Sequence, residues 1–337
     1  MPRLLSGFPA PRLDRIPMHI LTRSDLADLQ VSPSDVISAV EDGYLAFARG
    51  ESRCPTKLMM PLPDERRDSV SYSMLGYDAN LEHLGFKTSY RQGSQTNEKY
   101  YTTITLYDDV TGLPFALMDC QRIGASRTPA TTALIARSCA APGARSALMI
   151  GTGVQGVNTL PYLLTVLPDL ATIRLFGTHP EGIASSKRTL REHFPDRELE
   201  MVEDVREAVA ASDIVVVASG RAAHPPIDVQ WLPPGGLMIS VASKGVAAGA
   251  MRDSDYNITT SIGQLGVTGT RLASGGEVRV DAVLPDILAG KSPGRRTPTD
   301  RVFAFSSGMI ITDIPVAHAF ATRAIAAGRG QNVELWT

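Results

Sequence analysis

The sequence predicts an α/β protein whose parallel sheet lies in the second half of a chain of 337 residues. Between residues 146 and 241, short apolar segments alternate with helical ones, which is the pattern of parallel strands joined by crossover helices. Residues 69–119 are instead rich in Tyr, Thr, Val and Leu, which is typical of strands that follow one another directly. At ~100–200 residues per domain, this length predicts about two domains.

The first third is expected to hold a helix and a hairpin. Apolar residues recur at helical spacing over residues 31–50, and Ser34 is the expected N-cap. Residues 100–106 and 113–118 are strand-like, flank a turn that contains Gly112, and are expected to pair. This part is therefore predicted to be mixed α+β.

The parallel sheet is expected to follow a helix over residues 128–139. Its apolar strands are expected at 146–150, 172–176, 198–202, 213–218 and 237–241. The helices between them are expected at 153–167, 181–193 and 205–211. Two further strands, at 257–261 and 302–306, would complete the sheet, and a last helix over 311–327 would leave it.

Composition argues against several classes of function. Lys and Arg number 33 against 35 Asp and Glu, so the positive excess typical of nucleic-acid binders is missing. The apolar runs are far shorter than the ~20 residues of a membrane span, and the N-terminus lacks the apolar stretch of a signal peptide. Three widely spaced cysteines and six scattered histidines predict neither disulfides nor a metal site. We therefore expect a cytoplasmic protein without a nucleic-acid or membrane partner.

Residues 151–156 read Gly-Thr-Gly-Val-Gln-Gly, directly after an expected strand and at the start of an expected helix. In a βαβ unit this G-x-G-x-x-G pattern indicates dinucleotide binding. The first glycine permits the tight turn, the second admits the pyrophosphate, and the third lets helix and strand pack closely. The expected cofactor contacts here are Gly151, Thr152, Gly153, Val154 and Gln155. The alternative is a glycine-rich turn that binds nothing.

The end of the next strand bears on the choice of cofactor. An Asp or Glu there would bind the ribose 2′-hydroxyl of NAD and repel the 2′-phosphate of NADP. This chain reads Phe176-Gly177-Thr178-His179 instead, with Lys187 and Arg188 in the following helix. We therefore predict a preference for NADPH, with NAD as the alternative, and cofactor contacts from Gly177, Thr178 and His179.

Several separated segments from Met18 onward resemble the ornithine cyclodeaminase and mu-crystallin family. They are Gly85-Phe86-Lys87, residues 112–119, Ser126-Arg127-Thr128, residues 151–155, and Ser307-Gly308-Met309 with Asp313. The resemblance implies a Rossmann domain at 126–307 inserted into a mixed α+β substrate-binding and dimerisation domain, made of 1–125 plus 308–337. It also implies a homodimer.

Members of that family bind α-amino or α-imino acids and move a hydride between the nicotinamide and the substrate Cα. By position, the resemblance implies that Arg53, Lys87 and Arg127 hold the substrate carboxylate and that Asp313 orders the site or assists proton transfer. It further implies cofactor contacts from Thr128, Ser243 and Ser307. A guanidinium and an ammonium suit an anionic substrate, although solvated surface cations and a helix-capping Asp313 are the alternatives.

The loop after the fifth strand departs from the cyclodeaminases of that family, which carry an Asp where this chain has Lys244. A lysine acts as a general base only with a strongly depressed pKa, so Lys244 is expected to stabilise the substrate or supply protons. We predict NADPH-dependent reduction of an α-imino acid, a cyclic ketimine or the imine of a 2-oxo acid and an amine, or the reverse dehydrogenation. The alternatives are a cyclodeaminase-type lyase with catalytic NAD and a non-catalytic NADPH-binding protein.

Overall fold

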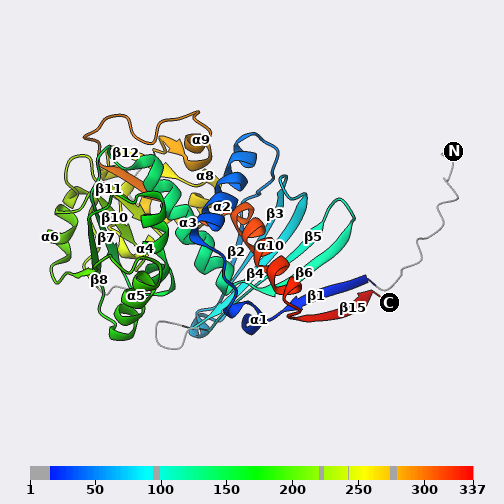
Figure 1. Cartoon of the computed structure of the whole chain (residues 1–337). Helices are drawn as coiled ribbons and strands as arrows, with labels where there is room; N and C mark the ends of the chain where they lie inside the picture. Colours follow the sequence, from blue (N-terminus) through cyan, green and yellow to red (C-terminus); the bar gives the residue numbers. More distant parts are fainter. Residues whose placement is uncertain (1–15, 94–98, 220–223, 242, 274–278, 337) are drawn as a thin grey trace, which may run out of the picture.

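The computed structural model describes residues 16–93, 99–219, 224–241, 243–273 and 279–336, and two sheets organise these residues (Figure 1). The first sheet has the strand order β15 (Gln331–Trp336), β1 (Ile16–Leu21), β6 (Leu113–Asp119), β5 (Lys99–Asp108), β4 (His83–Gln92), β3 (Val70–Asp78), β2 (Leu58–Pro61). Its strands pair antiparallel except for β1 with β6. The predicted hairpin is confirmed as β5 and β6.

The second sheet is parallel and confirms the predicted α/β class. Its order is β13 (Ala282–Val283), β12 (Tyr256–Thr259), β14 (Val302–Phe305), β11 (Leu237–Ser240), β10 (Ile214–Val217), β7 (Ser146–Ile150), β8 (Thr172–Phe176), β9 (Glu200–Met201). Successive side chains of a strand point to opposite faces, so Leu148 and Met149 enter two different apolar cores. Both faces are therefore buried, which is why these strands lack polar alternation.

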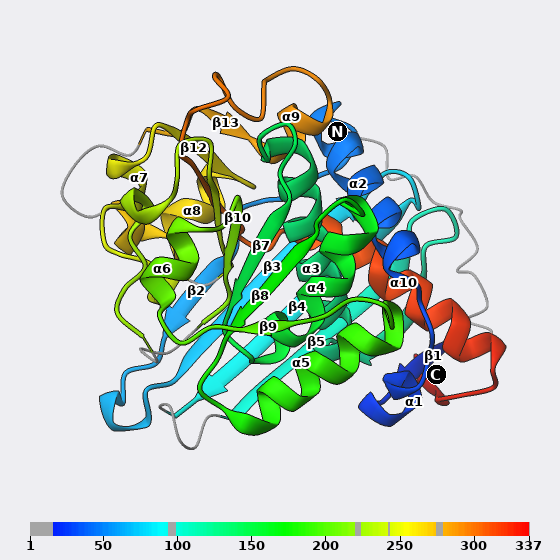
Figure 2. The ribbon, with the colours of Figure 1, turned by 60° about the vertical axis from the view of Figure 1, so that its left-hand side comes forward.

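Helices cover both faces of this parallel sheet (Figure 2). One side carries α3 (Gln121–Cys139), α4 (Val154–Val166) and α5 (Pro180–His193). The other carries α6 (Val205–Ala210), α7 (Ala250–Asp253) and α8 (Ile262–Thr268). The shorter elements are α1 (Arg23–Ala27), α9 (Leu284–Leu288), and the 3-10 turns η1 (Glu65–Arg67), η2 (Val229–Trp231), η3 (Ser243–Gly245) and η4 (Thr270–Ala273).

Two helices lie on one face of the first sheet, α2 (Pro33–Ala48) and α10 (Ile310–Ala326). The start of α10 approaches β3 and β4 very closely at two glycines. A Cβ on Gly76 would lie 2.3 Å from the Ile310 side chain, and one on Gly85 would lie 2.5 Å from that of Ile314. Only glycine permits this approach, which brings the first turn of α10 against the middle of β4.

Several predicted boundaries are wrong for identifiable reasons. The N-cap of α2 is Ser32 rather than Ser34, because the Ser32 hydroxyl accepts from the Asp35 amide at 3.1 Å and Pro33 occupies the first helical position. Helix α3 begins seven residues before the predicted 128, since buried packing of Ile123 outweighs weak local propensity. The proposed domain boundary at 125/126 therefore falls inside α3, and the division into two domains stays a prediction.

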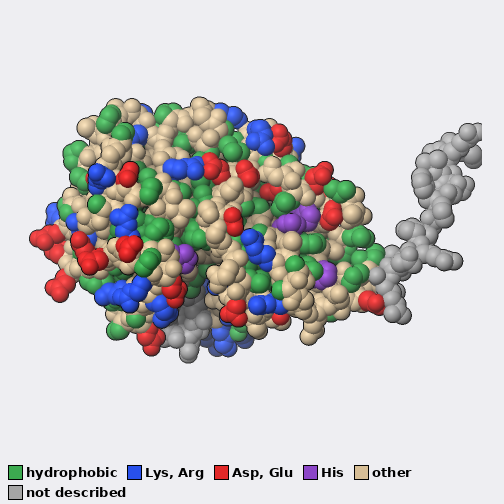
Figure 3. Space-filling view, in the orientation of Figure 1, with side chains coloured by type: hydrophobic (Ala, Val, Ile, Leu, Met, Phe, Trp, Pro, Cys, Tyr) green, Lys and Arg blue, Asp and Glu red, His purple; other side chains and the backbone are tan. Residues whose placement is uncertain are grey.

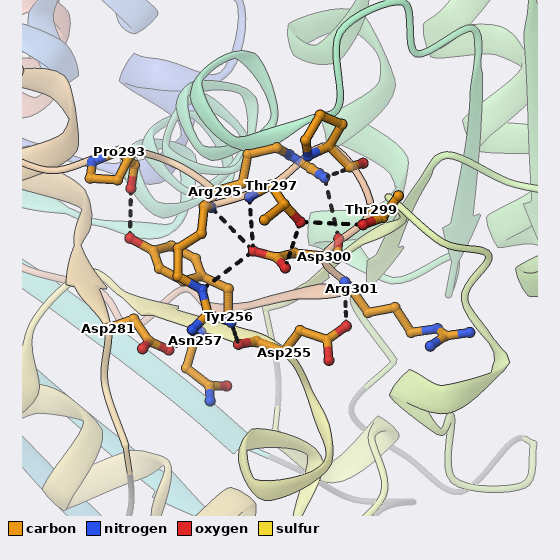
Figure 4. Close-up of polar contacts among 12 residues, drawn as sticks. Asp255, Tyr256, Asn257, Asp281, Pro293, Arg295, Thr297, Thr299, Asp300 and Arg301 are labelled. Atoms are coloured by element: carbon orange, nitrogen blue, oxygen red, sulfur yellow. Dashed lines mark hydrogen bonds and ion pairs between the residues drawn. The ribbon is translucent and has the colours of Figure 1, made fainter.

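The segment that precedes β14, residues 290–301, contains no helix or strand but is held firmly. Arg295 donates from Nη2 to the carbonyls of Cys139, at 2.8 Å, and Gly235, at 3.0 Å. Asp300 accepts from the Thr297 hydroxyl at 2.8 Å and from the Thr297 amide at 3.1 Å (Figure 4). These bonds fix the end of the sheet at which the parallel strands begin. The glycine-rich turn lies at the other end, where the strands finish.

Charged side chains are mixed over the surface. On the face drawn in Figure 3, Lys and Arg lie among Asp and Glu instead of gathering into one patch, as expected for a net charge of −2. Within the described ranges, no helix combines the length and the apolar character that crossing a bilayer requires.

Candidate functional site

Three predicted site residues from distant parts of the chain meet at one buried carboxylate. Lys87 of β4 donates from Nζ to Asp313 Oδ1 at 2.7 Å, and Arg127 of α3 donates from Nε to the same oxygen at 2.9 Å. The Asp313 side chain is fully buried, and those of Lys87 and Arg127 are only 10% and 13% exposed. The fold thus joins β4, α3 and α10 in one ionic cluster.

The local sequence makes room for this cluster. Asp313 stands in the first turn of α10, where its carboxylate pairs with the cations and the N-cap Met309 makes no side-chain cap bond. The observed bonds of Asp313 are therefore ion pairs, and not the helix-capping bonds of the alternative interpretation. A Cβ on Gly308 would lie 2.6 Å from an Arg127 Nη atom, so the glycine of Ser307-Gly308-Met309 leaves space for the guanidinium.

Electrostatics keep the three groups charged. Burial by itself raises the pKa of Asp313, but the charges of Arg127 and Lys87 and their hydrogen bonds outweigh it and lower the pKa below the ordinary value. Burial lowers the pKa of Lys87 and of Arg127, and the Asp313 charge more than reverses this for both. Two cations and one carboxylate leave the cluster with one excess positive charge at neutral pH.

Lys57 adds a third cation that the sequence did not predict. Its Nζ donates to Ser307 Oγ at 3.3 Å, and Ser307 directly precedes the Gly308 that packs on Arg127. Burial, followed by repulsion from Arg127 and Lys87, lowers the pKa of Lys57 to about 8. A bound anion would relieve this repulsion, so the cluster is suited to an anionic ligand.

The chain around Lys57 is held from the parallel-sheet side of the molecule. Gln264 of α8 is buried, its Oε1 accepts from the Lys57 amide at 3.3 Å, and its Nε2 donates to the Pro55 carbonyl at 3.2 Å. A Cβ on Gly263 would lie 2.4 Å from Thr56 Oγ1, which shows how closely α8 approaches this segment. These long-range hydrogen bonds set the position of Lys57, and no local sequence pattern indicates them.

Arg53 lies elsewhere, although it was predicted to hold the substrate. It is exposed, and its Nη1 donates to the carbonyls of Gly50, Glu51 and Ser52 just beyond α2. The structure does not bring it together with Lys87 and Arg127. Lys57, four positions further along the chain, lies next to the cluster instead, and local spacing does not distinguish the two residues.

A cavity of about 530 Å³ opens beside Lys87 and Arg127. Val154 and Gln155 of the glycine-rich turn also line it. Gln155 Nε2 donates to the Gly124 carbonyl at 3.2 Å, while its Oε1 has no partner among the described residues. The cationic cluster and the glycine-rich turn therefore face one common space.

The glycine-rich turn has the geometry that a dinucleotide phosphate requires. Gly151 has a φ of 108°, and a Cβ on Gly156 would lie 2.0 Å from the Gly151 carbonyl oxygen. Gly153 is the N-cap of α4, makes no side-chain cap bond, and has no described atom within 4 Å of a Cβ built on it. The open N–H groups at this helix start fit a pyrophosphate group, so these residues fit the predicted cofactor.

The predicted residues at the end of β8 lie beside this turn. A Cβ on Gly177 would lie 2.4 Å from the Thr152 side chain, so the two segments are in close contact. Thr178 and His179 are exposed, and His179 is the N-cap of α5, with Nδ1 accepting from the Gly182 amide at 3.4 Å. The placement is compatible with a cofactor contact, which stays a prediction.

Lys244 is not brought into the ionic cluster. It is exposed in η3 after β11, and its side chain makes no hydrogen bond or ion pair with another described residue. Arg271 fixes the turn by donating to the carbonyls of Ser243, at 2.9 Å, and Lys244, at 3.2 Å. Thr128 is buried in α3 next to Arg127. The roles of Lys244, Ser243 and Thr128 stay predictions.

Comparison with known proteins identifies relatives over most of the chain. The chain is similar to Delta(1)-pyrroline-2-carboxylate reductase of Bacillus cereus, 24% identical over 334 residues, covering 94% of this chain and all of that protein. It is 23% identical to ketimine reductase mu-crystallin of Mus musculus over 308 residues, covering 88% of this chain and 94% of that one.

A solved structure of Delta(1)-pyrroline-2-carboxylate reductase from Thermococcus litoralis, in complex with NADH and L-proline, matches with a TM-score of 0.80 and 26% identity. The match covers 94% of this chain and 100% of that one. The family model described as the ornithine cyclodeaminase/mu-crystallin family matches residues 18–327. The chain therefore belongs to the ornithine cyclodeaminase/mu-crystallin family.

Proposed function

We propose that the chain is an NADPH-dependent reductase of an α-imino acid, either a cyclic ketimine or the imine of a 2-oxo acid and an amine, which also runs the reverse dehydrogenation. One observation carries the proposal. Lys87 and Arg127 pair with the Asp313 carboxylate beside a cavity that the glycine-rich turn also lines, and Lys57 lies behind them on Ser307. The names of the reductase relatives, one solved with NADH and L-proline, support the part of the proposal that concerns imine reduction with a nicotinamide cofactor.

In this proposal the cations hold the substrate carboxylate. Arg127 offers a planar fork of donors, Lys87 and Lys57 offer point charges, and Asp313 fixes the orientation of two of them through one oxygen. The carboxylate adds one negative charge to a site with two excess positive charges, so binding is electrostatically favourable. Holding the carboxylate fixes the position and orientation of the neighbouring C=N carbon.

The bound nicotinamide supplies the hydride that the imine carbon receives. The nitrogen enters the reaction protonated, and the C=N electron pair becomes its lone pair, so the amine forms without a base near the carbon. Lys244, exposed on the turn after β11, or a water is the proposed source of protons for the substrate nitrogen. A carboxylate base is not needed at that position for net reduction, in contrast to a cyclodeaminase.

The preference for NADPH rests on the segment after β8. Residues 177–179, directly after β8, include no acid to bind a 2′-hydroxyl or to repel a 2′-phosphate, while the exposed Lys187 and Arg188 follow in α5. We expect a lower KM for NADPH than for NADH. An equal or lower KM for NADH would overturn this part of the proposal.

We also propose a homodimer formed through the first sheet. On its outward face, opposite α2 and α10, only alternate residues of each strand are presented, and these are uncharged: every second residue from 71 to 77, from 84 to 92 and from 101 to 107. Large apolar ones are exposed on it, including Leu58, Met60, Leu75, Phe86 and Tyr101. Such a patch marks an interaction surface. Analytical ultracentrifugation at micromolar protein concentration tests the homodimer; a monomer at that concentration would contradict it.

We propose the cytoplasm as the location of the protein, in keeping with three unpaired cysteines.

The test of the reaction is NADPH oxidation with cyclic imino acids and with mixtures of 2-oxo acids and amines. We expect turnover with at least one of them and formation of the amino acid. An Arg127→Met variant is expected to lose most of it, because the substrate carboxylate loses its bidentate partner. Ammonia release from a diamino acid without net NADPH consumption would instead favour a lyase, and tight NADPH binding without any turnover would favour a non-catalytic protein.

A further inference from the structure

The cavity extends well past the cations that hold the α-carboxylate. Lys87 pairs with Ile104 across β4 and β5, and the inward-facing residues that follow on β5 toward its start are Thr102 and Tyr100. At ~3.4 Å per residue, they stand roughly 7 and 14 Å from that pair along the strand. The cavity is lined by both of them, so it has a remote part in addition to the cluster.

The remote part carries donors that the fold leaves without partners. Thr102 is 7% exposed, and its hydroxyl oxygen has no hydrogen-bond partner among the described residues. A buried unpartnered hydroxyl costs stability unless a ligand or water satisfies it. Gln121, at the start of α3, lines the same space. This part of the cavity is therefore built to receive a polar group.

A cation completes the remote part. Arg23, the first residue of α1, lines the cavity and donates from one Nη to Asp119 at 3.2 Å. Asp119 in turn accepts from the Gln121 amide at 3.0 Å, so it aligns Arg23 with the start of α3. The Arg23 side chain is 57% exposed, which leaves its other N–H donors available to a ligand.

We propose that the substrate carries a second carboxylate beyond Cα, bound by Arg23 with Thr102, Tyr100 and Gln121. This inference rests on the proposed function and names the class of its substrate: imines of dicarboxylic 2-oxo acids. None of the described residues that line the cavity is acidic, and the neighbouring Asp119 carboxylate is already paired with Arg23 and the Gln121 amide. A purely apolar side chain would leave the buried Thr102 hydroxyl without a hydrogen-bond partner and would not use the remaining N–H donors of Arg23, which disfavours monocarboxylic substrates.

The test compares NADPH oxidation with ammonia plus oxaloacetate or 2-oxoglutarate against ammonia plus pyruvate or 2-oxobutyrate. We expect kcat/KM to be at least tenfold higher for the dicarboxylic pair. Arg23→Gln is expected to lower the ratio of dicarboxylic to monocarboxylic kcat/KM at least tenfold, and Arg23→Lys to lower it less, because it keeps the charge. Using the ratio removes any general loss from a loosened α1.

Arg66→Gln is the matched control, since Arg66 is 90% exposed and pairs with Asp64 in η1. It should leave the ratio unchanged. Equal kcat/KM for the two pairs, or an Arg23→Gln variant with an unchanged ratio, overturns the inference while the reductase proposal stands. An absence of turnover with every imino acid, cyclic ones included, overturns both.

Discussion

The pH dependence of the reaction follows from the environment of Lys57. Burial and repulsion from Arg127 and Lys87 lower its pKa to about 8 in the free protein. In the proposed site the protonated form binds the substrate carboxylate, so kcat/KM is expected to be high below pH 8 and to fall as the pH rises through that value. Roughly nine-tenths of Lys57 is charged at pH 7 and roughly one-tenth at pH 9.

Two variants separate this ionisation from that of the imine itself. The arginine of Lys57→Arg stays charged over the whole pH range. The pH profile of its kcat/KM is therefore expected to lose the decrease near pH 8 and to keep only the decrease caused by deprotonation of the imine. Lys57→Gln removes the charge at every pH. A charge-assisted hydrogen bond is worth about 1.5–3 kcal/mol, which predicts a fall in kcat/KM of roughly 10–150-fold at pH 7.

The assay is initial-rate NADPH oxidation with a cyclic imino acid between pH 6 and 10. The ratio of the wild-type to the Lys57→Arg kcat/KM should fall roughly 15-fold between pH 8 and pH 9.5. A ratio that stays constant over this range would refute the argument, because the decrease would then belong to the substrate or to another residue. A Lys57→Gln variant with wild-type kcat/KM would also refute it.

Three further predictions concern the site. Asp313→Asn leaves the buried Lys87 and Arg127 without their counter-ion, so urea unfolding should show a loss of about 3–5 kcal/mol; a loss below ~1 kcal/mol would contradict the role given to this carboxylate. Arg53→Gln should leave the substrate KM within about twofold, since among the described residues its guanidinium bonds to backbone carbonyls alone, and a tenfold rise in KM would return Arg53 to the site. Gly156→Ala places a Cβ where Gly151 O is 2.0 Å away, so NADPH titration should show at least tenfold weaker binding, and unchanged binding would exclude the assigned cofactor turn.

The parallel sheet could be predicted from sequence because its signal is local. Strands buried on both faces are continuous apolar runs, and crossover helices must separate them, so β7, β8, β10 and β11 appear where the pattern puts them. The edges are less predictable. β9 has two exposed residues instead of the expected five, since an edge strand buries little. β1 and β15 pair with each other from opposite ends of the described chain, which no local pattern can indicate.

The candidate site could also be predicted only in part from the sequence. Lys87, Arg127 and Asp313 were identified through separate motifs that the family resemblance supplied, and the fold brings them within hydrogen-bond distance. Lys57 was missed because its position depends on Gln264, more than two hundred residues away along the chain. Arg53, close by in sequence, carries the more suggestive side chain but turns back onto the end of α2. Long-range contacts decide between them.

In the proposed reaction, a hydride passes from the nicotinamide to the carbon next to the substrate carboxylate. This transfer is tested most directly with NADPH that carries deuterium at the transferred C4 position and with a cyclic imino acid as substrate. Mass spectrometry and proton NMR of the product amino acid should show one deuterium, located at Cα. An amino acid product without deuterium at Cα, or no product while ammonia is released from a diamino acid, would contradict the account.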